Sequence, residues 1–155
     1  MEYSHIEVTA SLGLLRITIQ RPDQRNALTS ACIDELSTAF AATASQSDVR
    51  CVLLTGSGTE AFCAGADLSE LQSNPDPSAR RSFFTSIAAL ITAIRQCPVP
   101  VVTAVHGFAL AGGLGLVAAS DISIASDDAV FGLPEVAIGL APMVVMAPLA
   151  ATLNS

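Results

Sequence analysis

Two short glycine-containing segments place backbone N–H groups where they can do chemistry. Ala64-Gly65-Ala66-Asp67 and Ala111-Gly112-Gly113 each follow a strand-like stretch and precede a helix. The N–H groups in the first turn of a helix have no intrahelical acceptor, and the positive end of the helix dipole reinforces them. Two such groups that converge form an oxyanion hole, and small residues let a substrate reach the backbone. Alternatively, these glycines only allow a helix to pack closely on a strand.

Glu135 is the carboxylate whose surroundings single it out. It follows Pro134 and precedes the uncharged stretch 136–155. Apolar surroundings favour the protonated form of a carboxyl, which is a property that a general acid–base group needs. An acidic residue at the start of a helix is also stabilised by the helix dipole without any catalytic role. The residues alone favour this second interpretation.

The elements that would position these segments are strands alternating with helices. Strands are expected at 6–9, 14–19, 49–54, 99–105 and 122–125, with a further short run at 129–131. Helices are expected at 79–96, near 112–120, and from Thr29 or Ser30 through Ile33, Leu36 and Phe40, whose spacing is helical. The polar segment 69–78, with Pro75 and Pro77, is expected to be a surface loop. A hairpin followed by strand–helix units predicts one α/β domain with strands buried by helices, and 155 residues fit one domain.

The composition restricts the class of protein. Apolar residues make up 51% and charged residues 14%, and this combination excludes intrinsic disorder. Seven basic residues, all Arg, against 14 acidic ones give a net charge of −7, which argues against a nucleic-acid partner. The four cysteines show no CxxC pair and no His at metal-ligand spacing. We therefore expect buried, reduced thiols, no metal site and a cytoplasmic protein without a secretion signal.

Three other classes of protein are disfavoured by the arrangement of residues. The uncharged stretches 97–120 and 136–155 are long enough for transmembrane helices, but prolines and glycines interrupt both, so no membrane span is expected. Residues 56–61 and 113–118 match the GxGxxA pattern. Neither match has a convincing acidic partner about 20 residues on, so a dinucleotide-binding domain stays a remote alternative. No GxSxG motif supports a serine hydrolase.

Four stretches occur in order along nearly the whole chain: Arg21-Pro22 with Asn26-Ala27-Leu28; 62–68 (FCAGADL); 105–113 (VHGFALAGG); and 120–122 with 131–140 (FGLPEVAIGL). Together they resemble the enoyl-CoA hydratase/isomerase, or crotonase, family. The resemblance implies a crotonase-like spiral of ββα units, with mixed sheets flanked by helices. It also implies an acyl-CoA thioester substrate, no cofactor beyond the coenzyme A that the substrate carries, and a homo-oligomer, either a trimer or a hexamer.

The resemblance also assigns roles to residues. The N–H groups of Ala66 and Gly112 would hold the thioester oxygen, and Glu135 would be the catalytic acid–base. The segment Ala64, Gly65, Ala66, Asp67 and Leu68 would line the path of the coenzyme A and acyl chain. The loop Arg25, Asn26 and Ala27 would approach the coenzyme A, where Arg25 suits a phosphate, although a solvated charge fits the sequence equally well.

Two departures from the family pattern affect these expectations. Hydratases of the family typically carry a second Glu at the position of Gly115, and a single carboxylate suits moving a proton between two carbons of one enolate. The resemblance therefore favours an isomerase over a hydratase. Family chains also continue well past residue 155, so residues 1–155 are expected to form the core domain without the C-terminal helical region. A non-catalytic acyl-CoA-binding or assembly module remains the alternative.

Overall fold

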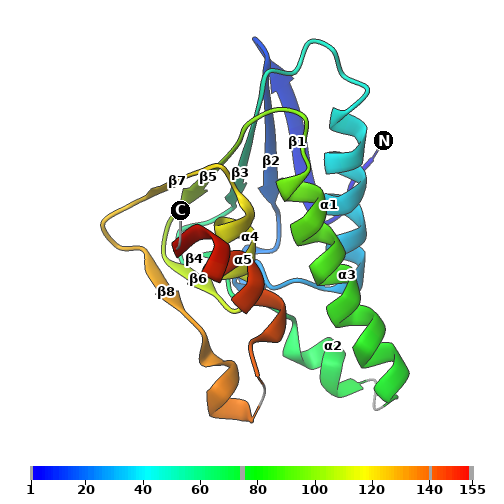
Figure 1. The fold of residues 1–155 in the computed structure, drawn as a ribbon, viewed down its shortest axis with the longest axis vertical. Helices are drawn as coiled ribbons and strands as arrows, with labels where there is room; N and C mark the ends of the chain where they lie inside the picture. Colours follow the sequence, from blue (N-terminus) through cyan, green and yellow to red (C-terminus); the bar gives the residue numbers. More distant parts are fainter. Residues whose placement is uncertain (1, 74–75, 140, 154–155) are drawn as a thin grey trace.

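The computed structural model describes residues 2–73, 76–139 and 141–153, which form two β-sheets and the helices around them (Figure 1). The larger sheet has the strand order β1-β2-β3-β5-β7. Its strands are β1 (Ile6–Ser11), β2 (Leu14–Ile19), β3 (Cys51–Gly56), β5 (Val101–Val105) and β7 (Ile122–Ala125). β1 and β2 form the expected antiparallel hairpin, and the other pairs are parallel.

The smaller sheet consists of parallel strands in the order β4-β6-β8. These strands are β4 (Ala61–Cys63), β6 (Phe108–Leu110) and β8 (Val130–Gly132). The α-helices are α1 (Ser30–Thr43), α2 (Leu68–Ser73), α3 (Pro77–Arg95), α4 (Gly112–Ala119) and α5 (Met143–Leu153). Two 3-10 turns complete the described elements: η1 (Pro22–Gln24) and η2 (Pro134–Ile138).

The chain repeats one structural unit three times. Each unit contributes a strand to the larger sheet, then a strand to the smaller sheet, and then a helical element. The successive units are β3-β4 with α2 and α3, β5-β6 with α4, and β7-β8 with η2. This arrangement confirms the mixed α/β class and the ββα spiral that the resemblance implies.

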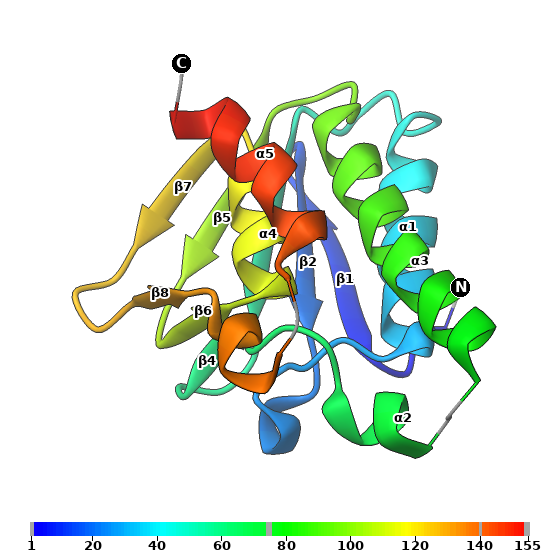
Figure 2. The ribbon, with the colours of Figure 1, turned by 60° about the horizontal axis from the view of Figure 1, so that its bottom comes forward.

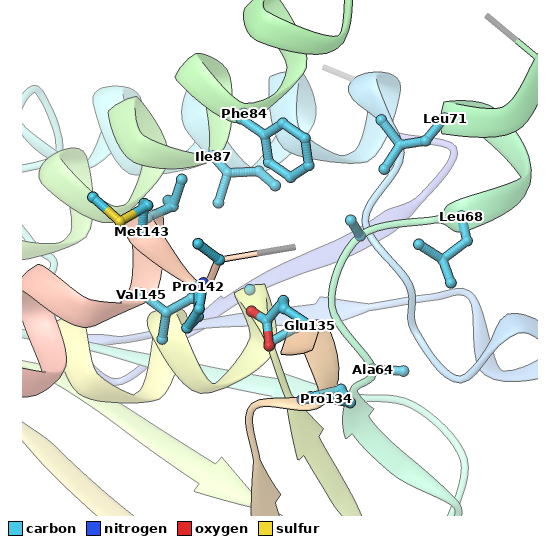
Figure 3. A pocket seen from close by; sticks show the side chains of 15 residues that line it. Ala64, Leu68, Leu71, Phe84, Ile87, Pro134, Glu135, Pro142, Met143 and Val145 are labelled. Carbon is cyan, nitrogen blue, oxygen red and sulfur yellow. The ribbon is translucent and has the colours of Figure 1, made fainter. Parts of the chain in front are cut away.

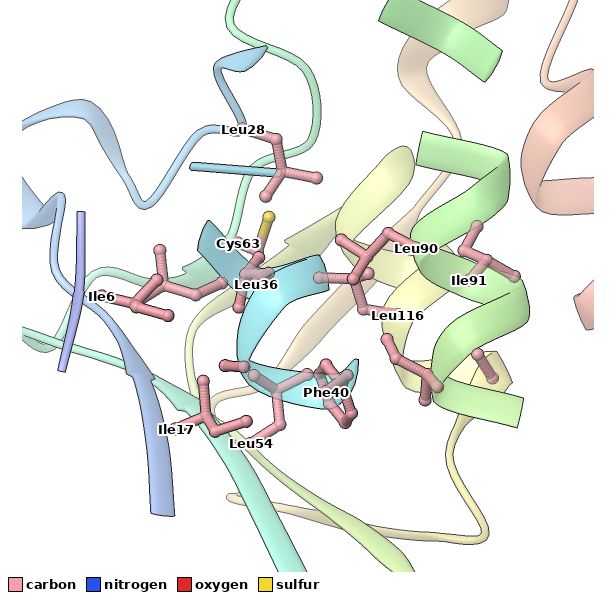
Figure 4. Close-up of a cluster of buried hydrophobic side chains, with 14 of the residues drawn as sticks. Ile6, Ile17, Leu28, Leu36, Phe40, Leu54, Cys63, Leu90, Ile91 and Leu116 are labelled. Carbon is pink, nitrogen blue, oxygen red and sulfur yellow. The ribbon is translucent and has the colours of Figure 1, made fainter. Parts of the chain in front are cut away.

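Helices α1, α3, α4 and α5 lie over one face of the larger sheet and enclose the core with it (Figures 2 and 4). Burial alternates along β3 and β5, as expected for strands covered mainly on one side. Helix α3 contributes an apolar stripe at helical spacing: Phe83, Ile87, Leu90, Ile91 and Ile94. Each fully buried Leu or Ile of this kind contributes about 1.5–3 kcal/mol, so the packed helices hold the sheet in place.

Two helix starts follow from capping residues in the sequence. The Thr29 hydroxyl accepts a hydrogen bond from the Cys32 N–H at 3.2 Å, which confirms the expected start of α1. Asp76 caps α3 by accepting from the Ser78 N–H at 2.9 Å, and Pro77 occupies the first turn, where its missing N–H costs nothing.

The loop expected over 69–78 was wrong at both ends, since Pro77 and Ser78 already belong to α3. Residues 68–73 form α2, because the Asp67 carboxylate accepts from the Ser69 N–H at 3.1 Å and so caps this short helix. Asn74 and Pro75, which belong to the same expectation, lie outside the described residues. The stretch 97–120 divides into β5, β6 and α4 as the interruptions indicate, and no helix among the described residues is long and apolar enough to cross a membrane.

Candidate active site

A cavity of about 440 Å³ opens between α2, α3, α5 and the N-terminus of α4. Its walls are apolar, and Figure 3 shows their side chains facing one another across the space. The wall residues that carry the largest apolar side chains are Leu68, Leu71, Phe84, Ile87 and Met143. Glu135 is the only one of the described lining residues with an ionisable side chain.

The smaller sheet brings the predicted site segments together. Its three strands are parallel, so the segments that follow them leave from the same edge of the sheet. β4 is followed by Ala64 to Asp67, β6 by Ala111 and Gly112, and β8 by Glu135 two residues after Leu133. Ala64, Ala66, Gly112 and Glu135 all line the cavity as a result.

The backbone around Ala66 leaves its N–H free. Leu28 bridges this segment on both sides, since its N–H donates to the Gly65 oxygen at 2.7 Å and its oxygen accepts from the Asp67 N–H at 2.8 Å. Within the described part of the chain, neither the Ala66 N–H nor the Gly112 N–H has a hydrogen-bond acceptor. Both donors border the cavity, and Gly112 is the first residue of α4.

Two glycines, Gly65 and Gly113, explain how the two segments come so close. Gly65 has φ +93°, and a Cβ there would lie 2.7 Å from the Ala111 Cβ and 3.2 Å from the Gly112 nitrogen. A Cβ on Gly113 would lie 2.1 Å from the Cys63 oxygen, so this glycine serves close helix–strand packing. Gly112 has its nearest neighbour at 3.5 Å. Close helix–strand packing therefore accounts for Gly113, whereas Gly112 fits the interpretation as part of an oxyanion hole.

Glu135 lies in η2 and points into the cavity (Figure 3). Its Oε2 is buried and has no hydrogen-bond partner among the described residues. Burial of a carboxylate oxygen without a hydrogen-bond donor costs free energy. Such unpaired groups are expected where a substrate or its proton takes the place of the missing donor. This placement favours the acid–base interpretation of Glu135.

The predicted coenzyme A loop lies outside the cavity lining. Asn26 is fully buried, and its amide is used internally: its Nδ2 donates to the oxygens of Ser57 and Ala61, and its Oδ1 accepts from the Arg21 N–H. Its side chain therefore holds the loop in shape and is not available to a ligand. Ala27 is buried as well.

Arg25 is the exposed residue of that loop. Its guanidinium pairs with Glu60 at 2.9 Å and lies 6.0 Å from the centroid of the Phe108 ring. The Arg25 backbone oxygen accepts from the Ala64 N–H at 3.0 Å, which links the loop directly to the cavity wall. An exposed pair of this kind contributes little to stability and is easily exchanged for another anion.

Asp67 is not among the described residues that line the cavity, and it pairs with Arg21. Arg21 Nη2 lies 3.0 Å from Asp67 Oδ2, and both side chains are nearly buried. Burial acts to raise the pKa of the Asp67 carboxyl, but hydrogen bonds from Ser69 and Arg21 and the charge of Arg21 outweigh it. The pKa therefore lies below its ordinary value, and Asp67 is ionised at neutral pH.

Sequence reasoning missed the far wall of the cavity and the role of Arg21. Phe84 and Ile87 lie about one turn apart on α3, and their spacing alone indicates a core stripe. The apolar composition of α5 similarly indicates burial without saying against what. In the sequence, Arg21 stands out only as part of the Arg21-Pro22 loop motif. An Arg and an Asp at 46 residues' separation give no local signal that they pair.

The cysteines are free thiols and differ in burial. Cys32 and Cys63 are buried, whereas Cys51 and Cys97 are half-buried, so the expectation that all four are buried was wrong for these two. Burial raises the pKa of the Cys32 and Cys63 thiols to about 12. Cys63, although it directly precedes the site segment, is therefore protonated and is not a nucleophile.

Comparisons with known proteins agree with this fold. The family model for enoyl-CoA hydratase/isomerase matches residues 9–153, and the chain belongs to this family. It is 36% identical to the mitochondrial Delta(3,5)-Delta(2,4)-dienoyl-CoA isomerase of Mus musculus over 150 residues, which are 90% of this chain and 46% of that protein. It is 35% identical to the short-chain-enoyl-CoA hydratase of Clostridium acetobutylicum over 142 residues, which are 92% of this chain and 54% of that protein.

A solved structure supports the same assignment. The crystal structure of an enoyl-CoA hydratase from Bacillus anthracis matches with a TM-score of 0.85 at 34% identity, covering 90% of this chain and 54% of that one. The chain spans about half the length of the curated relatives it matches.

Proposed function

We propose that the chain processes acyl-CoA thioesters, with the thioester oxygen bound by the Ala66 and Gly112 N–H groups and a proton moved by Glu135. One observation carries this proposal: a buried carboxylate oxygen without a partner shares one cavity with two backbone donors that have no acceptor among the described residues. Membership of the enoyl-CoA hydratase/isomerase family supports it. The apolar walls suit an acyl chain.

The proposed reaction is the migration of a double bond beside the thioester. Glu135 removes a proton from C2 of a 3-enoyl thioester, and the electron pair moves onto the thioester oxygen as a dienolate. The Ala66 and Gly112 amides stabilise that negative charge. Glu135 then returns the proton to C4, so that the double bond moves from C3–C4 to C2–C3. No metal or redox cofactor takes part in these steps.

Isomerisation is proposed over hydration because Glu135 is the one carboxylate among the described residues that line the cavity. Hydration requires a water to be activated and a proton to be delivered to C2, which two carboxylates do most readily. At Gly115, a Cβ would lie 2.9 Å from the Ile91 Cδ1 and 3.4 Å from the Val145 Cγ2, so apolar side chains fill the space beside α4. Helix α4 therefore contributes no second carboxylate at this position.

We further propose that the coenzyme A lies on the Ala64 side of the cavity. Arg25 is exposed there, and its backbone is bonded to Ala64. A phosphate of coenzyme A would compete with Glu60 for the Arg25 guanidinium. Asn26 and Ala27 would support this loop from behind.

The test is the turnover of 2-enoyl-CoA and 3-enoyl-CoA substrates by the purified chain. We expect double-bond migration, and we expect Glu135→Gln to lower kcat by about a hundredfold or more, the typical contribution of an acid–base group. Glu7→Gln, at an exposed position on β1, is the matched control and should leave kcat unchanged. Predominant hydration would overturn the preference for an isomerase. Binding without turnover would favour the non-catalytic alternative.

A further inference from the structure

The Ala66 segment needs support that its own backbone does not supply. Residues 64–67 lie between β4 and α2. Among the described residues, their backbone is tied to the loop at 25–28 by the Leu28–Ala66 β-bridge and by the hydrogen bond from the Ala64 N–H to the Arg25 oxygen. The direction of an N–H group decides how well it binds an oxyanion, and a misplacement of about 1 Å can cost about a hundredfold in rate. The segment must therefore be held from outside the cavity.

Arg21 contacts both sides of that β-bridge. Its Nη2 donates to Asp67 Oδ2 at 3.0 Å, immediately after Ala66, and its Nη1 donates to the Ala27 oxygen, immediately before Leu28. The Arg21 backbone N–H is itself held by the buried Asn26 amide at 3.0 Å. One guanidinium thus joins the two backbone segments whose hydrogen bonds fix Ala66.

Asp67 uses its second oxygen for α2. Oδ1 accepts from the Ser69 N–H at 3.1 Å and from the Ser69 hydroxyl, while Oδ2 faces Arg21. The Arg21 and Asp67 side chains are 13% and 10% exposed, so solvent screens their interaction only weakly. Neither residue is among the described residues that line the cavity.

We infer that Arg21 and Asp67 form a positioning pair that fixes the direction of the Ala66 N–H and so sets the rate of the reaction at this site. The inference rests on the function proposed above. Because the pair does not reach the cavity, it acts through Ala66 and not on the substrate. Its loss should therefore lower kcat more than it changes KM.

The test compares Asp67→Asn, Arg21→Met and the double variant with the parent chain. Each single change should lower kcat for 3-enoyl-CoA by at least about tenfold while KM changes by less than about threefold. Since each change breaks the same contact, the double variant should be no slower than the slower single variant. Losses that multiply in the double variant would overturn the pair.

Glu35→Gln is the matched control for a structural carboxylate. Glu35 accepts from the N–H groups of Ser4, His5 and Ile6 at 3.0, 2.8 and 3.2 Å, on α1 and away from the cavity lining. It should lower the stability of the chain but leave kcat unchanged. If Asp67→Asn keeps the kcat of an active parent, the positioning pair is overturned.

Amide hydrogen exchange separates this inference from the proposed function. The Leu28 and Asp67 N–H groups should exchange at least about tenfold faster in Asp67→Asn and Arg21→Met than in the parent chain. The exchange rates of the amides in β2 and β3 should not change. A parent chain without turnover would overturn the proposed function. In that case, faster exchange in the two variants still supports the positioning pair as the contact that holds the Ala66 segment. Unchanged exchange overturns the pair.

Discussion

Asp67 and Glu135 are two carboxylates whose surroundings differ: Glu135 lines the cavity, and Asp67 is not among the described lining residues. Asp67 is surrounded by donors from Arg21, Ser69 and the start of α2. Glu135 has a buried oxygen with no donor among the described residues. A carboxylate that is fully paired holds structure, whereas one that lacks partners in a cavity is available to a substrate. The surroundings, and not the residue type, separate the two roles.

The ionised state of Asp67 makes the stability of the chain depend on pH. Its pKa is lower in the folded chain than in the unfolded one, where it is about 3.9. The folded state therefore binds fewer protons, and the stability from the pair, present above about pH 4, is lost as pH falls through the folded pKa. At pH 7, Asp67→Asn should lower the free energy of unfolding by about 3–5 kcal/mol, because it leaves Arg21 unpaired.

Urea unfolding of the parent and of Asp67→Asn at pH 7, 5 and 3 checks this prediction. The difference between the two free energies of unfolding should be largest at pH 7 and should shrink at pH 3. A difference that stays constant over this range would mean that Asp67 does not draw its stability from its charge.

At the scale of elements, the parallel order of β4, β6 and β8 is what makes a site. Each of the three strands has only three residues, yet together they release the two amide segments and Glu135 at one edge. The approach of the first two segments depends on Gly65, where a side chain would meet Ala111 and Gly112. Gly65 thus allows the segment that follows β4 to lie close to the start of α4.

Gly65→Ala should therefore disturb both stability and turnover. Alanine at φ +93° is strained by about 1–2 kcal/mol, and the overlap with Ala111 adds about 1–3 kcal/mol. Gly139→Ala is the matched control for stability, because Gly139 has φ +75° and no atom of the described residues lies within 4 Å of the added Cβ. Thermal unfolding should show the larger loss for Gly65→Ala. Equal losses would contradict the close approach of the two segments.

At the scale of the whole molecule, some of the many apolar side chains of the sequence lie exposed on the surface. All four residues of β7, an edge strand of the larger sheet, are exposed, and Ile122 and Ile124 are 54% and 62% exposed. Val130 and Phe131 on β8 are also exposed. An exposed, apolar edge strand is a template for association with another chain.

We predict that the chain self-associates through this edge, in keeping with the homo-oligomer that the family resemblance implies. Light scattering after size-exclusion chromatography should give a mass above that of one chain, and Ile124→Lys should lower it. Leu12→Lys, in the turn at the opposite edge of the sheet, makes the same change of charge and should have no effect. A monomer for the parent chain would contradict the prediction.

The sequence by itself determined the family and most of the elements, although not α2 or the short strands β4 and β6. Helical spacing located α1 and α3, the Thr29 cap located the start of α1, and motifs in order pointed to Ala66, Gly112 and Glu135. Only the tertiary structure decided that the Asn26 side chain is buried and hydrogen-bonded within the chain, that Arg21 pairs with Asp67, and that α3 and α5 line the cavity. Capping and spacing act over a few residues, so they can be read along the chain. Contacts such as the one between Arg21 and Asp67, 46 residues apart, exist only once the spiral has placed distant strands side by side.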